Sequence, residues 1–271
     1  MVTFVVFTDL DGTLLDHRTY GFRMALPALD MLLRRNVPVV PVTSKTSDEV
    51  RWWMGILGLK GPFAYENGSG IIIPEGYFPG KIKGASGQKG GLRISTGREI
   101  GDVRNALRNI AVELGLSIRA YGDMSSDEIT AATGLQGKEL ENSKRREFDE
   151  PFLVNGDYDH DDFVNAAAAR GMTAVRGGRF HHLLGDCDKG KAVRFLMDLF
   201  RRKDGNVISI GIGDSENDMG LFQSVDRPFL VQRPDGTYSS GIPEDEAERV
   251  AGPGPAGWRM AVEGFVSNAI N

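Results

Sequence analysis

The chain has one cysteine, no apolar run of membrane length and no excess of basic residues. Cys187 has no second cysteine to pair with, and no ligand residues beside it suggest a zinc site. The formal net charge of −5 disfavours the basic surface that nucleic acids or anionic membranes require. The apolar run at 2–7 stops before Asp9, which is too short for a signal peptide or a span. We therefore predict a cytoplasmic protein with no nucleic-acid or membrane partner, and no pattern indicates an oligomeric state.

Apolar runs that read as buried strands alternate with helical patterns at both ends of the chain. Hydrophobic residues make up 41% of the sequence, enough for a substantial core. The first segment predicts a strand at 4–8, a helix at 24–35, a strand at 37–43 and a helix at 47–57. The second segment predicts a strand at 207–213 between helices at 189–203 and 215–223. This alternation is typical of an α/β fold with a parallel sheet.

The middle of the chain has a different character and predicts an inserted α+β domain. A glycine-rich break, GASGQKGG at 84–91, precedes it. Helices are predicted at 97–115 and 161–171, and strands at 151–155 and 173–184. The charged stretch 138–147 is interpreted as a solvated helix or loop. We therefore predict a core made of 1–83 and 186–271, with an insertion at 84–185.

Polar residues follow the predicted core strands at the point where each strand ends. In open parallel sheets, ligands bind beyond the carboxyl ends of the strands, so these residues are expected to meet. Carboxylates brought together there repel, since two unit charges ~4 Å apart cost about 4 kcal/mol at an effective dielectric constant of roughly 20. Oxygen ligands without histidine or thiolate favour a hard cation such as Mg²⁺. The residues concerned are Asp9, Asp11, Thr43, Ser44, Lys45, Lys189, Asp214 and Asp218.

The carboxylates divide into predicted metal ligands and predicted chemical groups. We expect Mg²⁺ to be bound by the side chains of Asp9 and Asp214 and by the backbone carbonyl of Asp11, while Asp218 orients metal-bound water or Lys189 from behind. Asp9 is the predicted nucleophile, because a carboxylate in line with a neutralised phosphoryl group can displace its ester oxygen. Asp11 is the predicted acid that protonates the leaving alkoxide and the base that later activates water.

Neutral and cationic groups at the same edge are predicted to stabilise the transferring phosphoryl group. The hydroxyl of Thr43 and the backbone of Ser44 can donate hydrogen bonds to its oxygens. Lys189 adds a positive charge at a helix N-terminus, which already favours anions. The sequence therefore predicts phosphoryl chemistry at one end of the sheet.

These motifs resemble those of the haloacid dehalogenase-like phosphatases. The four motifs of that superfamily match Asp9 with Asp11 in DLDGT, Thr43, Lys189 in DKGKA and the pair Asp214 and Asp218 in GDSEND. The resemblance implies a Rossmann-like core, an aspartyl-phosphate on the first aspartate, and a cap inserted between the second and third motifs that selects the substrate. The insertion predicted at 84–185 has that position.

A finer resemblance, to the mannosyl-3-phosphoglycerate phosphatases, runs through most of the chain. It is carried by SKT at 44–46, PFAYENGSGIIIPEGYFP at 62–79, REFDEPF at 146–152, GGRFHHL at 177–183 and DKGKA at 188–192. It implies hydrolysis of mannosyl-3-phosphoglycerate to mannosylglycerate, a compatible solute, and phosphate. The substrate then carries a glycosyl group, a phosphate and a glycerate carboxylate.

The resemblance places further candidates around the substrate. Arg179 can grip the glycerate carboxylate through its guanidinium, or it forms a salt bridge within the cap. His182 is a second cap candidate, or a hydrogen-bonded structural group. Lys45 contacts phosphate or carboxylate, or forms a surface ion pair. Asn67 precedes a glycine and serves either the site or a turn.

Other functions use the same catalytic residues. A glucosyl-3-phosphoglycerate phosphatase, a general sugar-phosphate phosphatase and a phosphomutase would all need them, and release assays on different esters separate these. A non-catalytic protein that binds magnesium or a sugar phosphate belongs to another class. Asp9 and Asp11 together argue against it, because binding alone needs no nucleophile paired with an acid.

Overall fold

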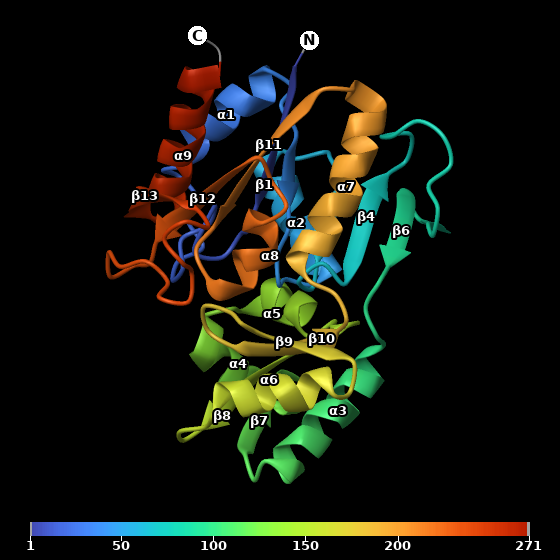
Figure 1. Cartoon of the computed structure of the whole chain (residues 1–271), viewed down its shortest axis with the longest axis vertical. Coiled ribbons are helices and arrows are strands. Elements are labelled where there is room, and N and C mark those ends of the chain that lie inside the picture. Colours follow the sequence, from blue (N-terminus) through green and yellow to red (C-terminus); the bar gives the residue numbers. More distant parts are fainter. Residues whose placement is uncertain (1, 270–271) are drawn as a thin grey trace.

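The computed structural model describes residues 2–269, and Figure 1 shows a larger body with a parallel sheet above a smaller one with an antiparallel sheet. The five-stranded parallel sheet has the order β13-β12-β11-β1-β2. Its strands are β1 (Thr3–Thr8), β2 (Val39–Pro41), β11 (Val207–Gly213), β12 (Arg227–Gln232) and β13 (Glu248–Pro253). The predicted α/β fold is confirmed, and the two segments predicted to form the core meet at the pairing of β1 with β11.

Helices cover both faces of this sheet because alternate residues of β1 point to opposite sides. Val6 packs on one face with α1 (Leu26–Arg34), α2 (Ser47–Leu57) and α9 (Gly254–Ala269). Val5 and Phe7 pack on the other face against α7 (Lys189–Asp204) and α8 (Met219–Phe222). All three side chains are fully buried. The helix predicted at 215–223 is instead a 3₁₀ turn at Glu216–Asp218 followed by the short α8.

A second, antiparallel sheet follows α2 and was not predicted. Its order is β3-β4-β6-β5, with β3 (Phe63–Tyr65), β4 (Gly70–Pro74), β5 (Ser86–Gln88) and β6 (Gly91–Ser95). The glycine-rich stretch 84–91 therefore lies within this sheet, and hydrogen bonding continues from β4 to Ser95. β6 pairs with β4 and so lies with the core, although 91–95 falls inside the predicted insertion. The limits of the inserted domain stay a prediction.

The inserted segment forms a four-stranded antiparallel sheet of order β7-β8-β10-β9. Its strands are β7 (Ser117–Ala120), β8 (Asp149–Asn155), β9 (Met172–Arg176) and β10 (His181–Gly185), and one face is covered by α3 (Ile100–Glu113) and α6 (His160–Ala168). The single strand predicted at 173–184 is wrong. Gly177 and Gly178 turn the chain there, and the Gly177 N–H donates to the Phe180 carbonyl at 2.9 Å, so the segment is a hairpin.

The uncovered face of the cap sheet is directed at the core, and two helices fill the space beside it. α5 (Gly137–Ser143) lies between the two bodies (Figure 1) and contacts α2, and α4 (Ser126–Thr133) lies beside α5 at the edge of the smaller body. The interpretation of 138–147 as a solvated helix or loop is correct for the exposed residues Lys138, Glu141, Lys144 and Arg145 and wrong for two others. Asn142 and Ser143 are buried, and the Asn142 carbonyl accepts a hydrogen bond from Thr46 Oγ1 at 2.9 Å. The charged composition of this stretch masked an interface.

Glu66 and Asn67 anchor the cap to the core. Both have left-handed backbone, with φ of 47° and 54°, and both are buried. The Glu66 carboxylate accepts hydrogen bonds from the backbone N–H groups of Glu147, Phe148 and Asp149. Burial raises the pKa of Glu66 to about 7, although these bonds oppose the shift. A buried carboxyl group of the core thus binds the backbone at the start of the cap strand that begins at Asp149.

We expect the unfolding free energy to fall as pH rises from about 4.5 to about 7, because Glu66 binds its proton more tightly when folded. The contribution is on the order of 3 kcal/mol for a shift of this size. Urea unfolding across this interval measures it. Glu66→Gln is expected to reduce this slope, to which Asp9 and Asp214 contribute with the same sign, whereas Glu75→Gln, at an exposed position, should leave it unchanged. An unaltered slope in Glu66→Gln would assign the titration to another group.

Candidate active site

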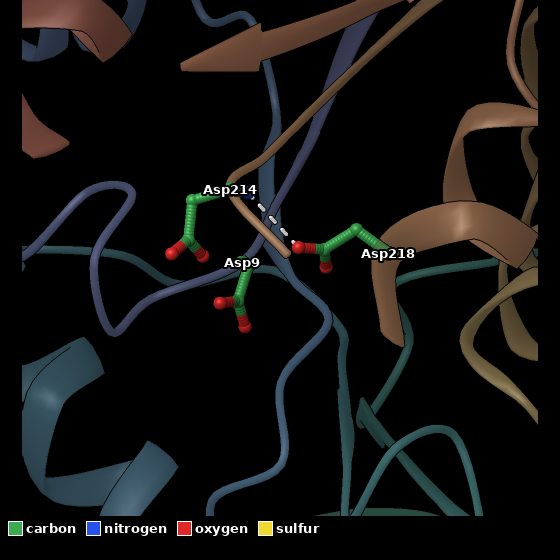
Figure 2. A group of neighbouring side chains, drawn as sticks. All are labelled: Asp9, Asp214 and Asp218. Carbon is green, nitrogen blue, oxygen red and sulfur yellow. Dashed lines mark hydrogen bonds between the residues drawn. The ribbon is translucent and has the colours of Figure 1, made fainter. Parts of the chain in front are cut away.

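Three aspartates meet at the carboxyl end of the parallel sheet. Asp9 follows β1, Asp214 follows β11, and Asp218 closes the 3₁₀ turn after it. Figure 2 shows the carboxylates of Asp9 and Asp214 side by side, with that of Asp218 directed at the Asp214 backbone. One oxygen from each of the three lies within 4.8 Å of the others, and all three residues are buried. The predicted convergence of these residues is what the structure shows.

Asp218 is held by protein donors on both of its oxygens. Oδ2 accepts from the backbone N–H groups of Asp214 at 3.0 Å and Ser215 at 3.1 Å. Oδ1 accepts from Lys189 Nζ at 2.6 Å. These contacts fix both the loop that carries Asp214 and the side chain of Lys189, which is the arrangement that an orienting residue needs.

Lys189 is the fully buried cation of the cluster. Its Nζ lies 2.9 Å from Asp9 Oδ1 and 2.6 Å from Asp218 Oδ1. Lys189 is the first residue of α7, and the N-cap residue Asp188 fixes that end of the helix by accepting a hydrogen bond from the Lys191 N–H at 2.7 Å. The ammonium group therefore bridges two carboxylates that would otherwise repel.

The cluster has more negative than positive charge. Burial raises the pKa of Asp9 to about 6, and Lys189 opposes the shift. Burial, Asp218 and Asp9 raise the pKa of Asp214. Three carboxylates surround one ammonium group, and every atom that they offer to a metal is an oxygen. The residues present therefore fit a hard divalent cation.

The backbone of the first motif is shaped to let Asp214 approach. Gly12 has a φ of 80°, and a Cβ on it would lie 2.6 Å from Asp214 Oδ2. Only glycine meets both conditions. The next residue, Thr13, donates from Oγ1 to Asp214 Oδ1 at 3.3 Å. The glycine and threonine of DLDGT thus position a carboxylate from the other end of the chain.

Asp11 faces the space beside the cluster, where it meets Lys45. Lys45 Nζ lies 2.9 Å from Asp11 Oδ2 and 3.6 Å from Glu49 Oε1. The lysine is buried, so the surface ion pair considered from sequence is not what forms. Asp11 Oδ1 is buried and has no hydrogen-bond partner within residues 2–269. The carboxyl group therefore has one oxygen free to act on a ligand.

Thr43 and Ser44 follow β2 at the same edge. Thr43 is fully buried, and its Oγ1 accepts from the Lys45 N–H at 3.4 Å. Ser44 lines a pocket between core and cap. Charged and titratable groups on its walls include Asp9, Asp11, Lys45, Arg146, Arg179 and His182.

The two cap residues predicted from GGRFHHL both line this pocket. Arg179 Nη1 donates to the hydroxyl of Tyr20 at 2.7 Å, and its guanidinium lies over the Tyr20 ring at 5.4 Å. His182 Nδ1 lies 3.0 Å from both carboxylate oxygens of Asp149. A carboxylate accepts, so Nδ1 donates and Nε2 is left for other contacts.

Asn67 does not reach the pocket wall. Its Nδ2 donates to Asp149 Oδ2 at 2.8 Å, and its Oδ1 accepts from Asn217 Nδ2 at 3.0 Å. Both amide atoms are therefore engaged in joining the cap to the loop after β11. The predicted substrate contact of Asn67 has no support in this geometry.

No family model matches the chain, but curated proteins do. It is 37% identical over 268 residues to a glucosyl-3-phosphoglycerate/mannosyl-3-phosphoglycerate phosphatase of Methanococcoides burtonii, covering 98% of each. The chain belongs to the mannosyl-3-phosphoglycerate phosphatase family. A mannosyl-3-phosphoglycerate phosphatase of Pyrococcus furiosus is 34% identical over 228 residues, which cover 84% of this chain and 90% of that protein.

Solved structures place this phosphatase among proteins of the HAD fold. A HAD subclass IIB sugar phosphatase matches 97% of the chain and 99% of its own length with a TM-score of 0.68 at 13% identity. The sucrose-phosphatase of Synechocystis matches 98% and 99% with a TM-score of 0.60 at 17% identity. At such identities the likeness shows the fold alone. No helix of residues 2–269 has the length and apolar character that crossing a membrane requires.

Several residues at the site of this phosphatase were not predicted. Two cations lie near the Tyr20 ring, with Lys45 Nζ 5.0 Å and the Arg179 guanidinium carbon 5.4 Å from its centroid. Arg146 lines the pocket from the cap, and the segment REFDEPF was the signal that could have indicated it. Cys187 is buried, and burial raises the pKa of its thiol to about 11, which disfavours the thiolate that a reactive cysteine needs.

Proposed function

We propose that this phosphatase hydrolyses mannosyl-3-phosphoglycerate to mannosylglycerate and phosphate through an aspartyl-phosphate on Asp9, with Mg²⁺ as cofactor. The observation that carries the proposal is the buried Asp9 carboxylate, which borders the pocket while Lys189 and Asp214 adjoin it. A nucleophilic carboxylate must border the space that holds the substrate, with positive charge nearby to stabilise the phosphoryl oxygens. The catalytic core is proposed to be 1–83 and 186–271, the cap 84–185, and the location cytoplasmic.

The metal ligands are proposed to be the carboxylates of Asp9 and Asp214 and the backbone carbonyl of Asp11. A bound Mg²⁺ supplies positive charge that offsets the surplus carboxylates and the phosphate oxygens. Asp218 holds Lys189 and the Asp214 backbone in place behind these ligands. The protein thereby supplies a site in which two anions, carboxylate and phosphate ester, can approach each other.

The reaction is proposed to proceed in two displacements. An oxygen of Asp9 attacks phosphorus, the bond to the ester oxygen breaks, and Asp11 gives its proton to the leaving alkoxide. Asp11 then takes a proton from water, which attacks the aspartyl-phosphate and releases inorganic phosphate and Asp9. Thr43, Ser44 and Lys189 stabilise the phosphoryl oxygens during both steps.

The cap is proposed to recognise the rest of the substrate. Arg179 and His182 line the pocket from the cap and Lys45 from the core, and three such groups suit an ester that carries more than one anionic group. The name of the M. burtonii relative covers both glucosyl and mannosyl esters. Hydrolysis of the glucosyl ester is therefore the second candidate activity of the same site.

Phosphate release from mannosyl-3-phosphoglycerate, measured with Mg²⁺ and again in excess EDTA, tests the proposal. Glucosyl-3-phosphoglycerate and hexose phosphates are assayed beside it. We expect turnover of the mannosyl ester with kcat/KM at least about 10-fold above that of hexose phosphates, and loss of turnover in EDTA. Preference for a hexose phosphate would contradict the proposed substrate. Full activity in EDTA would contradict the proposed cofactor. Substrate conversion with little free phosphate would indicate a mutase, and no turnover of any ester a binding protein.

A further inference from the structure

Arg146 places a guanidinium in the pocket wall with one edge unused. The side chain is 7% exposed. Its protein contacts run through Nη1, which donates to the Ser44 carbonyl at 2.8 Å and lies 3.7 Å from Asp149 Oδ2. Nε is buried without a hydrogen-bond partner, and Nη2 makes no hydrogen bond within residues 2–269. Nε and Nη2 form one edge of the planar group, and both of their donors are free.

This free edge is unusual for a buried cation. Asp149 does not satisfy it, because its carboxylate already accepts from Asn67 and His182 and stands nearest to Nη1. Nε is the buried one of these two nitrogens, and an unpaired buried donor destabilises a protein, so it needs an acceptor from the pocket: water in the free protein, or a ligand group in the complex. Arg179 differs, because its Nη1 donates to the Tyr20 hydroxyl and no nitrogen of its side chain is both buried and unpaired within residues 2–269.

The edge is also held in a fixed orientation. The Arg146 guanidinium lies over the ring of Tyr121 at 5.4 Å, and the Ser44 carbonyl fixes Nη1. Two parallel N–H groups on a fixed plane match the two oxygens of a carboxylate. A group fixed before binding loses little conformational freedom when the ligand arrives. The geometry therefore suits a bidentate carboxylate contact.

Its position relative to the phosphoryl chemistry identifies the carboxylate. Ser44, to which Arg146 is bonded, directly follows Thr43 at the edge where the phosphate is proposed to bind. In a 3-phosphoglycerate ester, the carboxylate and the phosphate sit on the same three-carbon unit, so a carboxylate-binding group must adjoin the phosphate site. Lys45 is already engaged by Asp11 and Glu49.

We propose that Arg146 is a specificity-determining residue that binds the glycerate carboxylate of the substrate through its Nε and Nη2 edge. The proposal rests on the proposed function, because it takes the substrate to be a phosphoglycerate ester. It adds to Arg179 a second arginine, contributed by the segment between α5 and β8. Because Arg146 also bonds to Ser44 of the core, a carboxylate held there would bridge cap and core.

Calorimetric binding of 3-phosphoglycerate and glycerol 3-phosphate in Mg²⁺ tests this, with every protein carrying Asp9→Asn so that neither ester is hydrolysed. The two ligands differ in that glycerol 3-phosphate has a hydroxymethyl group in place of the carboxylate. The protein with Arg146 intact is expected to bind 3-phosphoglycerate about 10- to 100-fold more tightly, as one charged bidentate contact allows. Arg146→Met should abolish that preference while changing glycerol 3-phosphate affinity by less than about 3-fold. Arg146→Lys, which keeps the charge and is the second variant if Arg146→Met does not fold, should retain only part of it.

Arg145→Met is the matched control. Arg145 is the neighbouring arginine, exposed and paired with Asp48 at 2.8 Å, and its loss should preserve the preference for 3-phosphoglycerate. Equal weakening of both ligands by Arg146→Met would assign the guanidinium to phosphate or to cap docking and overturn the proposal, as would no weakening. Binding is measured apart from turnover, so an enzyme that hydrolyses no ester would overturn the proposed function while the carboxylate preference still reports on Arg146.

Discussion

Asp9→Asn is expected to lower the rate of phosphate release by about 10⁴-fold or more, because the amide that replaces the carboxylate is a poor nucleophile. The side chains have nearly the same shape, so the fold should persist. Lys189 Nζ lies 2.9 Å from Asp9 Oδ1 and can still be bonded by an amide oxygen there. Steady-state phosphate release from the preferred ester measures the loss.

Trapping of the covalent intermediate separates a nucleophile from a metal ligand. Rapid acid quenching followed by mass spectrometry should find a phosphoryl group on Asp9 in the wild type and none in Asp9→Asn. Asp48→Asn is the control, since Asp48 lies in α2 and pairs with exposed Arg145. Appreciable turnover by Asp9→Asn, or a phosphoryl group on another residue, would contradict the proposed mechanism.

The parallel core could be predicted because its strands leave a strong signal in sequence. A strand buried on both faces reads as a continuous apolar run, as at 4–8 and 207–213. The carboxyl ends of such strands meet at one edge, so the strand pattern alone was enough to bring Asp9 and Asp214 together from opposite ends of the chain. The role of each aspartate stays a prediction that the variants must test.

The cap interface could not be predicted, because its residues are held by partners that lie far away in the sequence. Glu66 and Asn67 look like an ordinary turn before a glycine, yet they hold the backbone and the side chain of Asp149. Charged residues usually mark solvated surface, so Arg146 gave no local signal of burial. Tyr20 likewise lies in a loop and becomes part of the pocket only once the cap docks.

The same limit applies to the second sheet and to the cap hairpin. β3 and β5 have three residues each, too few for a periodic pattern. In the hairpin, the glycine pair at 177 and 178 was the available turn signal, and the surrounding apolar residues outweighed it. Short strands and tight turns are specified by their pairing partners more than by their own composition.

Lys189→Met is expected to destabilise the phosphatase by about 3 to 5 kcal/mol, because it removes the buried cation that two buried carboxylates share. The loss should be larger above the Asp9 pKa of about 6 than below it. Below that pKa, a protonated carboxyl group no longer needs a cation. Lys189 also opposes the rise of the Asp9 pKa, so its removal should move that pKa higher still.

Urea unfolding of Lys189→Met and wild type, on both sides of that pKa and with or without Mg²⁺, measures these effects. Mg²⁺ should recover part of the lost stability, since a cation bound to Asp9 and Asp214 offsets the same carboxylates. Lys191→Met is the control from the same helical turn, because Lys191 is exposed and pairs with Asp186. Equal destabilisation at both pH values, with no response to Mg²⁺, would mean that Lys189 acts by packing, and the surplus negative charge could not then be the reason for a metal at this site.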